Sequence, residues 1–276
     1  MKIAEIINLE RYPLNKLDSN EGVEFIGSIR ESMQHDGSCT LDQFVSDATR
    51  LEMVEQADSL VEFAFPGPSE VSPYFFNYRI GEQYKSDDRH PTQRKGRRNL
   101  SQVAADLIPP EHLLYQLYRS PLMTDFLGRV LQVPVYRNQD RYQSLNISVM
   151  DSGGCQQWHF DGGNMVTTLL LQAPEAGGVF EYVPNIRTDE NENFDMVRSV
   201  LDGESSRVKS LNLKPGTLSL FRGHYSLHRV TEVAGLVRRL QAILGYNTQP
   251  NFAGSLDSSI LHYGPRIADL ENSVAG

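Results

Sequence analysis

Residues 157–163 read Gln-Trp-His-Phe-Asp-Gly-Gly, and the interpretation of the whole chain is built on this stretch. It contains a His-x-Asp pair formed by His159 and Asp161. Successive side chains of a β-strand point to opposite faces, so residues two apart share a face. A short strand that ends here therefore brings one nitrogen ligand and one oxygen ligand to the same point.

A second histidine, His228, lies in the segment Tyr-Ser-Leu-His-Arg-Val at residues 225–230, after a strand-like run at residues 216–221. His224 competes with it for the same role. His224 lies on a turn, where a solvent-exposed histidine is the ordinary expectation. We favour His228 because strand-like residues follow it directly.

Two imidazoles and one carboxylate form the facial triad that holds non-haem Fe(II) and leaves positions open. No nearby cysteine completes a structural zinc set, and we interpret Cys155 as a packed, unreactive thiol. A lone His-x-Asp pair is common by chance, so its weight here comes from the strand-like runs around it. We predict that His159, Asp161 and His228 are the metal ligands and the catalytic residues.

Residues 144–150 form one of these runs, because apolar and polar side chains alternate along it. The alternation places Asn146 and Ser148 on one face and the apolar residues on the other. Asn146 is a candidate for binding a cosubstrate or substrate in a central cavity. A purely structural hydrogen bond explains this residue equally well.

From about residue 145 to 250 the chain resembles the core of the Fe(II)/2-oxoglutarate oxygenases. More narrowly, it resembles the BesD/HalD-like family of free-amino-acid halogenases and hydroxylases. The matching segments are residues 158–161, 171–187 and 227–231. This resemblance implies an α+β protein with a mainly β core, a jelly-roll or cupin-like double-stranded β-helix braced by N-terminal helices. It also implies Fe(II) and 2-oxoglutarate as cofactor and cosubstrate, O2 as oxidant, and ascorbate as an aid in keeping the iron ferrous.

Oxygenases of this class hold the far carboxylate of 2-oxoglutarate with a basic residue shortly after the second iron-binding histidine. Arginine suits this task because it donates two parallel hydrogen bonds to a carboxylate. Arg238 and Arg239 both qualify by their position, and alternation lets only one of them point inward. The match of residues 239–244 to the family pattern favours Arg239, and leaves Arg238 at the surface.

Two departures from the halogenases bear on the reaction and the substrate. The halogenases have glycine in place of the iron-binding carboxylate, whereas this chain has Asp161, which implies hydroxylation of an unactivated C–H bond. The resemblance suggests a free polar amino acid such as lysine as substrate. Gln156 and Gly162, however, stand where the halogenases have a histidine and an aspartate that contact substrate, which implies a changed substrate.

Residues 85–99 are polar and strongly basic toward their end, which is typical of a solvated loop. The alternative is a lid, about residues 83–99, that brings one arginine inward. The resemblance implies that an arginine from this region contacts the amino-acid substrate. The sequence leaves the choice between Arg94, Arg97 and Arg98 open.

Three other functions stay open. An oxygenase acting on a carrier-bound or peptidyl residue would need a wide basic mouth near residues 94–98. A non-catalytic barrel with a vestigial site is disfavoured because the three ligands and Arg239 are all present. A cupin-like enzyme with another metal would form no succinate.

The pattern of the chain predicts a single domain over residues 1–276. We expect an N-terminal support at 1–143, the β core at 144–250 and a tail at 251–276 along the barrel edge. Helices are predicted at 19–33, 109–118, 120–131, 191–201 and, with Thr40 as N-cap, from 40 to about 57. Residues 61–65 and 72–79 are predicted to be strands.

Composition limits the partners. A net charge of −9 argues against nucleic-acid binding, and an apolar content of 39% suits a soluble protein. The N-terminus does not read as a signal peptide, and no run has the length of a membrane-spanning helix. Cys39 and Cys155 make no disulfide framework, which suits a reducing cytoplasm. We expect a cytoplasmic enzyme with a small-molecule partner and no membrane partner, and the oligomeric state stays open.

Overall fold

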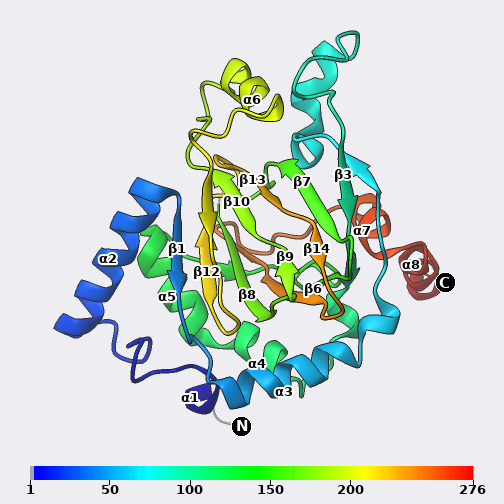
Figure 1. Ribbon diagram of the computed structural model, residues 1–276. Helices are drawn as coiled ribbons and strands as arrows, with labels where there is room; N and C mark the ends of the chain where they lie inside the picture. Colours follow the sequence, from blue (N-terminus) through cyan, green and yellow to red (C-terminus); the bar gives the residue numbers. More distant parts are fainter. Residues whose placement is uncertain (1–2, 164, 276) are drawn as a thin grey trace.

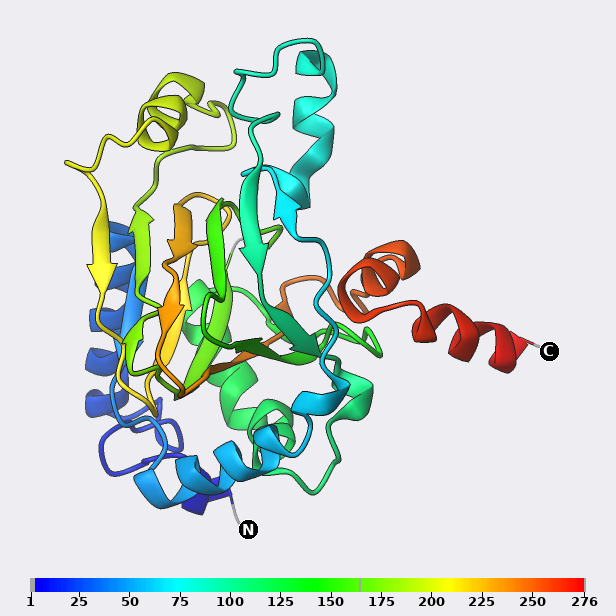
Figure 2. The ribbon, with the colours of Figure 1, turned by 45° about the vertical axis from the view of Figure 1, so that its right-hand side comes forward.

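The computed structural model describes residues 3–163 and 165–275. Within them, two antiparallel sheets of six strands each form the centre of the molecule (Figures 1 and 2). The order of the first sheet is β1 (Ser38–Leu41), β12 (Leu218–Phe221), β8 (Val166–Gln172), β15 (Arg239–Leu244), β6 (Leu145–Met150), β4 (Ser101–Val103). The order of the second sheet is β11 (Lys209–Leu211), β10 (Phe180–Val183), β13 (Leu227–Val230), β7 (Cys155–His159), β3 (Gly96–Asn99), β2 (Glu70–Val71).

Two short ribbons complete the strands of the described chain. They pair β9 (Ala176–Gly177) with β14 (Val233–Ala234), and β5 (Tyr136–Arg137) with β16 (Tyr246–Asn247). The fold is thus the double-stranded β-helix with helical support that the resemblance implied.

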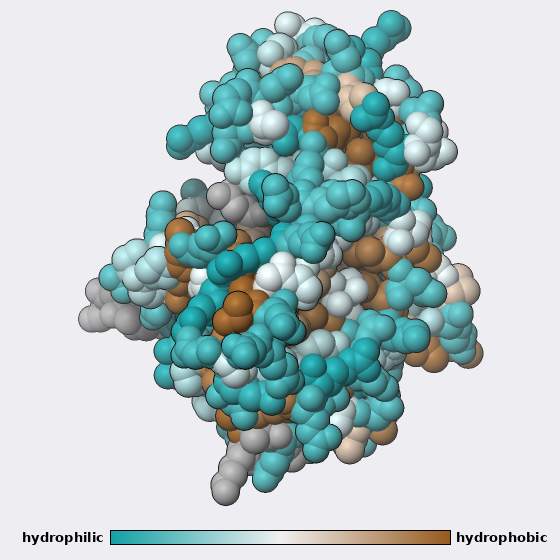
Figure 3. Space-filling view, turned by 90° about the vertical axis from the view of Figure 1, so that its left-hand side faces the viewer, coloured by the Kyte–Doolittle hydropathy of each residue, from teal (hydrophilic) through white to brown (hydrophobic). Residues whose placement is uncertain are grey.

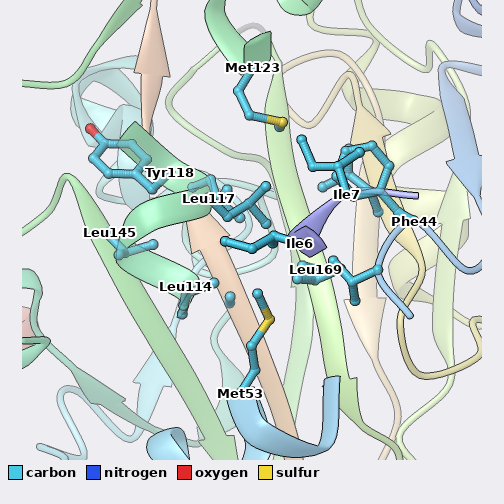
Figure 4. Close-up of a cluster of buried hydrophobic side chains, with 14 of the residues drawn as sticks. Ile6, Ile7, Phe44, Met53, Leu114, Leu117, Tyr118, Met123, Leu145 and Leu169 are labelled. Carbon is cyan, nitrogen blue, oxygen red and sulfur yellow. The ribbon is translucent and has the colours of Figure 1, made fainter. Parts of the chain in front are cut away.

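Helices cover the outer face of the first sheet. They are α1 (Ile3–Ile6), α2 (Asn20–Asp36), α3 (Asp47–Asp58), α4 (Leu113–Arg119) and α5 (Pro121–Leu131). The largest apolar cluster lies between these helices and the sheet, and Figure 4 shows Ile6, Met53 and Leu117 packed beside Leu145 and Leu169. Burial of this apolar surface is the main stabilising contribution to the layer.

The predicted alternation of residues 144–150 is confirmed in β6. Leu145, Ile147 and Val149 belong to the apolar cluster under the helices, whereas Asn146 and Ser148 line a cavity on the other face. Strand β15 repeats the pattern, with its leucines toward the helices and its polar side chains toward the interior. The interior between the sheets is therefore partly polar, which prepares it for a binding site.

Several predicted helices agree with the structure, but the one expected from Thr40 does not. Thr40 lies in β1 and pairs with Ser219 of β12, and Gln43 has a φ of 54°, which a right-handed helix does not allow. Helix α3 instead begins at Asp47, with the Ser46 side chain accepting a hydrogen bond from the Thr49 N–H. The predicted cap at Thr40 is therefore wrong, because residues 38–41 pair with the sheet instead.

Other segments also differ from expectation. Residues 61–63 form the 3-10 helix η1 (Val61–Phe63), and the aromatic run lies partly in η2 (Phe75–Tyr84), so neither is a strand. The expected loop at 83–99 is wrong at both ends, because η2 reaches Tyr84 and 96–99 form β3.

The remaining helices lie beyond or beside the core strands. Helix α6 (Phe194–Leu201) fits the helix predicted at 191–201. The tail forms α7 (Leu256–Tyr263) and α8 (Arg266–Ala275), and both lie on the β3 side of the molecule (Figure 1). A 3-10 helix, η3 (Ala105–Leu107), follows β4.

Hydrophilic residues dominate the face seen from the α2 side, where hydrophobic residues appear only in small areas (Figure 3). None of the described helices combines the length and the apolar character that crossing a membrane requires.

Candidate active site

Three predicted ligands converge between the two sheets. His159 ends β7 and is the direct cross-strand partner of His228 in β13, and their ring centroids lie 4.0 Å apart. The two carboxylate oxygens of Asp161 lie 3.9 Å from His159 Nε2 and 3.3 Å from His228 Nε2. One ligand atom from each residue lies within 4.8 Å of the others, as binding to one metal ion requires.

Backbone carbonyls fix the tautomers of both histidines. His159 Nδ1 lies 2.9 Å from the Gln157 carbonyl oxygen, and His228 Nδ1 lies 2.9 Å from that of Ser226. A carbonyl only accepts, so each Nδ1 carries the proton and each Nε2 turns a lone pair to the site. Burial lowers the pKa of His159 to about 3, which keeps this imidazole neutral, the form that binds metal. The donor set fits Fe(II).

The main chain of Asp161 is held by three groups. Its N–H donates to the Gly223 carbonyl oxygen over 3.0 Å, and its own carbonyl accepts from Asn77 Nδ2 over 3.3 Å and from the His224 ring. The carboxylate lies directly against Gly223, where an added Cβ atom would be 1.8 Å from Asp161 Oδ2. Glycine at position 223 is therefore required for this carboxylate position, a requirement that the sequence did not reveal.

Gly223→Ala is expected to push the Asp161 carboxylate out of place and to weaken Fe(II) binding by at least about tenfold, the lower end of the range for residues that orient metal ligands. Anaerobic Fe(II) titration measures the effect. Gly27→Ala is the matched control, because a Cβ atom at this exposed helical position meets nothing within 4 Å. Wild-type iron affinity in Gly223→Ala would contradict the assignment of Asp161 as a ligand.

His224, the competing histidine, supports Asp161 and does not join the ligand cluster. Its carbonyl oxygen accepts from Arg187 Nε over 2.5 Å, and its Nδ1 lies 3.4 Å from Arg187 Nη2. Arg187 is 2% exposed, lies 4.0 Å above the Phe160 ring and pairs with Glu192 over 2.8 Å. Since arginine only donates, His224 Nδ1 accepts and its Nε2–H donates to the Asp161 carbonyl.

His224→Phe is expected to weaken Fe(II) binding about 10- to 100-fold, because it removes a donor that orients a metal ligand. His224→Gln keeps an amide N–H and is expected to recover part of the affinity. The thermal stability of both variants, measured without metal, serves as the control for folding. Equal iron affinities in the wild type and the phenylalanine variant would show that His224 has no positioning role.

A first cavity lobe extends from the metal ligands to Arg239. Arg239 is 3% exposed, and among the described residues its hydrogen-bond partner is Gln241 Oε1. Burial lowers its pKa to about 10, so the guanidinium is still charged at neutral pH. Ser219 Oγ is buried in the same lobe without a hydrogen-bond partner. A buried cation that has no acidic partner among the described residues fits the far carboxylate of 2-oxoglutarate.

Arg238 points elsewhere. Its guanidinium lies 3.2 Å from Asp58 Oδ1 and 3.1 Å from Asp151 Oδ1 at the surface. Of the two predicted arginines, only Arg239 lines the cavity.

A second lobe begins at the same metal ligands and extends toward β3 and α7. Its wall includes Phe76, Arg98, Gln102, Asn146 and His262. Asn146 faces this lobe and not the one that contains Arg239, so its position favours contact with substrate over contact with 2-oxoglutarate.

The structure also separates the three candidate arginines of the basic segment. Arg94 pairs with Asp202 over 2.6 Å and Arg97 pairs with Glu232 over 2.8 Å, both near the surface. Arg98 is 4% exposed and lines the second lobe. Arg97 and Arg98 are neighbours in β3, and the alternation of side chains along a strand turns Arg98 inward and Arg97 outward.

Two wall residues of the second lobe were missed by sequence reasoning. Phe76 lies in η2 and His262 lies in the tail helix α7, and their rings stack at 5.7 Å. Both residues lie outside the predicted core strands, and no local pattern marked them as cavity residues. Cys155 is buried and lies outside the metal cluster, in agreement with a packed thiol.

Comparisons with known proteins agree with this geometry. The model of the halogenase D (HalD) family matches residues 80–259, more than half of the chain. A search of curated proteins gave no match.

Solved structures share the fold at low sequence identity. The non-haem α-ketoglutarate-dependent epimerase SnoN from nogalamycin biosynthesis is 11% identical, with a TM-score of 0.55 over 82% of this chain and 83% of its own. A Trichoplax adhaerens prolyl hydroxylase in complex with a peptide is 14% identical, with a TM-score of 0.52 over 81% and 89%. AviO1 from Streptomyces viridochromogenes Tue57 is 14% identical, with a TM-score of 0.55 over 83% and 97%. The chain therefore belongs to the halogenase D family and is an Fe(II)- and 2-oxoglutarate-dependent oxygenase.

Proposed function

We propose that this oxygenase hydroxylates an unactivated C–H bond of a free amino acid. The observation that carries the reaction type is the carboxylate of Asp161, which lies between the two histidines at the point where the family's halogenases have glycine. A carboxylate in this position takes the place that a halide ion needs. Bound Fe(II) and 2-oxoglutarate supply the oxidation of the C–H bond by O2, with release of succinate and carbon dioxide.

The residues of the chain have separate tasks in this proposal. His159, Asp161 and His228 would hold the iron, and the fixed Nδ1 protons keep both histidines ready to bind it. Arg239 would bind the far carboxylate of 2-oxoglutarate.

Apolar walls around the first lobe have a further task, which is to limit the access of water. Phe180, Phe221 and Val230 line this lobe beside the metal ligands. Exclusion of water strengthens electrostatic interactions inside the site and suppresses side reactions.

The position of Arg98 favours a small substrate that carries a carboxylate group. Its guanidinium is buried in the second lobe and pairs with no carboxylate among the described residues, and its Nε has no hydrogen-bond partner. The neighbouring Arg94 and Arg97 are engaged by acidic side chains, so neither of these two arginines is free to bind the anionic groups of a carrier. A free amino acid meets these conditions.

The proposal is tested with a panel of free amino acids, Fe(II), 2-oxoglutarate and O2. Succinate formation that depends on an amino acid, with a product heavier by one oxygen atom, is expected. In the presence of chloride the product is expected to carry no chlorine. A chlorinated product, or succinate formation that no amino acid stimulates, would exclude the proposal.

Variants at neighbouring arginines then test the substrate contact. Arg98→Met is expected to weaken amino-acid binding at least about 30-fold, the effect of removing one partner of a buried charge pair. Arg97→Met, at an exposed site, is the matched control. Because Arg98 also donates to the Pro66 carbonyl oxygen, intact binding of Fe(II) and 2-oxoglutarate is used to verify the fold.

A further inference from the structure

Apart from the metal ligands, the described wall of the second lobe carries positive charge and no negative charge. Its ionisable wall residues, apart from the ligands His159 and Asp161, are Arg98, His262 and Tyr263. Among the described residues, no carboxylate other than Asp161 lines it, and Asp161 is committed to the metal. The residues outside the description, Met1, Lys2, Asn164 and Gly276, include no acid. A cationic substrate side chain inside the lobe therefore finds no free counter-charge.

The hydrogen bonds of the wall have a fixed direction. Arg98 Nη2 donates to Gln102 Oε1 over 2.8 Å, so the amide nitrogen of Gln102 turns to Asn146 and donates to its Oδ1 over 3.1 Å. The Asn146 amide nitrogen has no acceptor among the described residues and is left to donate to a ligand in the lobe. Arg98 and Asn146 thus present N–H donors, which suit one carboxylate group of a ligand.

The rest of the wall is uncharged. Gln143 and Gln156 contribute carboxamides and Phe76 contributes an aromatic face. His262 Nδ1 donates to the Ser258 carbonyl oxygen over 2.8 Å, so its Nε2, which is buried without a partner, is an acceptor. Burial lowers the pKa of His262, so the ring is neutral. Such a wall solvates neutral polar groups but balances no second charge.

We propose that this lobe selects amino acids with uncharged side chains and rejects lysine, ornithine and arginine. The inference rests on the proposed function and specifies its substrate class. Once Arg98 and Asn146 have taken the α-carboxylate, the carboxamides and His262 are left for the amino group and a neutral side chain. The α-ammonium group is balanced by the ligand's own α-carboxylate, but a charge on the side chain would be buried unpaired, a large cost in a site closed off from water.

Binding to the anaerobic protein loaded with Fe(II) and 2-oxoglutarate tests the inference by calorimetry, without turnover. The ligands are isosteric pairs that differ in charge: lysine and hydroxynorleucine, arginine and citrulline, glutamate and glutamine. In every pair that shows measurable binding, the uncharged member is expected to bind at least about 30-fold more tightly than its charged counterpart, the size expected for an unpaired buried charge.

The outcomes separate this inference from the function on which it rests. If a charged member binds as tightly as its uncharged partner or more tightly, the inference is overturned while the amino-acid oxygenase stands. If no free amino acid binds, the proposed function is itself overturned. The resemblance to the amino-acid halogenases suggested lysine as substrate, so the lysine pair is the most direct comparison.

A charge-introducing variant provides a second test. Gln156 lines both lobes, and Gln156→Glu adds a carboxylate with little change in shape. The variant is expected to shift the ratio of hydroxynorleucine to lysine affinity toward lysine by about 10-fold or more, since a counter-charge is now present. Gln34→Glu, at an exposed position of α2, is the matched control. An unchanged ratio in Gln156→Glu would contradict the electrostatic basis of the selection.

Discussion

Asp161→Ala is expected to abolish turnover and to weaken Fe(II) binding by more than about 100-fold. Loss of a residue that only supports a metal ligand weakens metal binding by up to about 100-fold, and loss of the ligand itself is expected to have a larger effect. The variant leaves two neutral imidazoles and removes the only anionic ligand in the described cluster. His159→Ala is expected to have a similar effect, because it removes one of two paired histidines. Iron titration and succinate formation measure both variants.

Asp151→Ala is the matched control for the loss of an aspartate. Its side chain is 67% exposed and pairs with Arg238 at the surface, and surface pairs of this kind contribute little to stability. We expect iron binding and turnover in this variant to equal those of the wild type. An Asp161→Ala protein that turns over at the wild-type rate after removal of iron would refute the metal centre altogether.

Arg239→Ala is expected to weaken 2-oxoglutarate binding by about 30-fold to several thousand-fold, the range for removing one member of a buried charged pair. The guanidinium is fully enclosed, and in the described part of the chain no acidic side chain neutralises it. Anaerobic titration, followed by the weak visible band of the iron–2-oxoglutarate chelate, measures the affinity. Iron affinity without 2-oxoglutarate is expected to change little.

The neighbouring arginine supplies the control for this experiment. Arg238→Ala removes the same charge from the same strand region, but from the outer side, where Asp58 and Asp151 hold it. We expect 2-oxoglutarate affinity close to that of the wild type. A stronger loss in Arg238→Ala than in Arg239→Ala would reverse the assignment of the anchor.

Short-range patterns predicted the strands of the core well. In β6 and β15, apolar residues face the helices and polar residues face the cavity, and such alternation is readable without a structure. The sequence also predicted that His159, Asp161 and His228 come together, and they do, although β7 ends at His159 and Asp161 lies just beyond the strand. The choice of Arg239 over Arg238 needed the resemblance to the family, since both positions fit by spacing.

What the sequence could not predict depends on contacts between distant segments. The capping pattern at Thr40 is locally sound, but hydrogen bonds to β12 outweigh it. Phe76 and His262 reach the second lobe from segments on either side of the core strands. Gly223 matters only because the Asp161 carboxylate lies against it, a contact that no local pattern encodes.

The two sheets pack against apolar clusters of different size, and this difference affects where the folded protein opens locally. The first sheet is backed by the large apolar cluster, whereas the ligand-bearing strands β7 and β13 face the polar cavity and pack against smaller clusters. Local opening follows the density of buried apolar contacts, so backbone amides of β8 and β15 are expected to exchange with deuterium last. Amides of β7 and β13 exchange earlier in the metal-free protein, and bound iron, which crosslinks the two strands, selectively slows them.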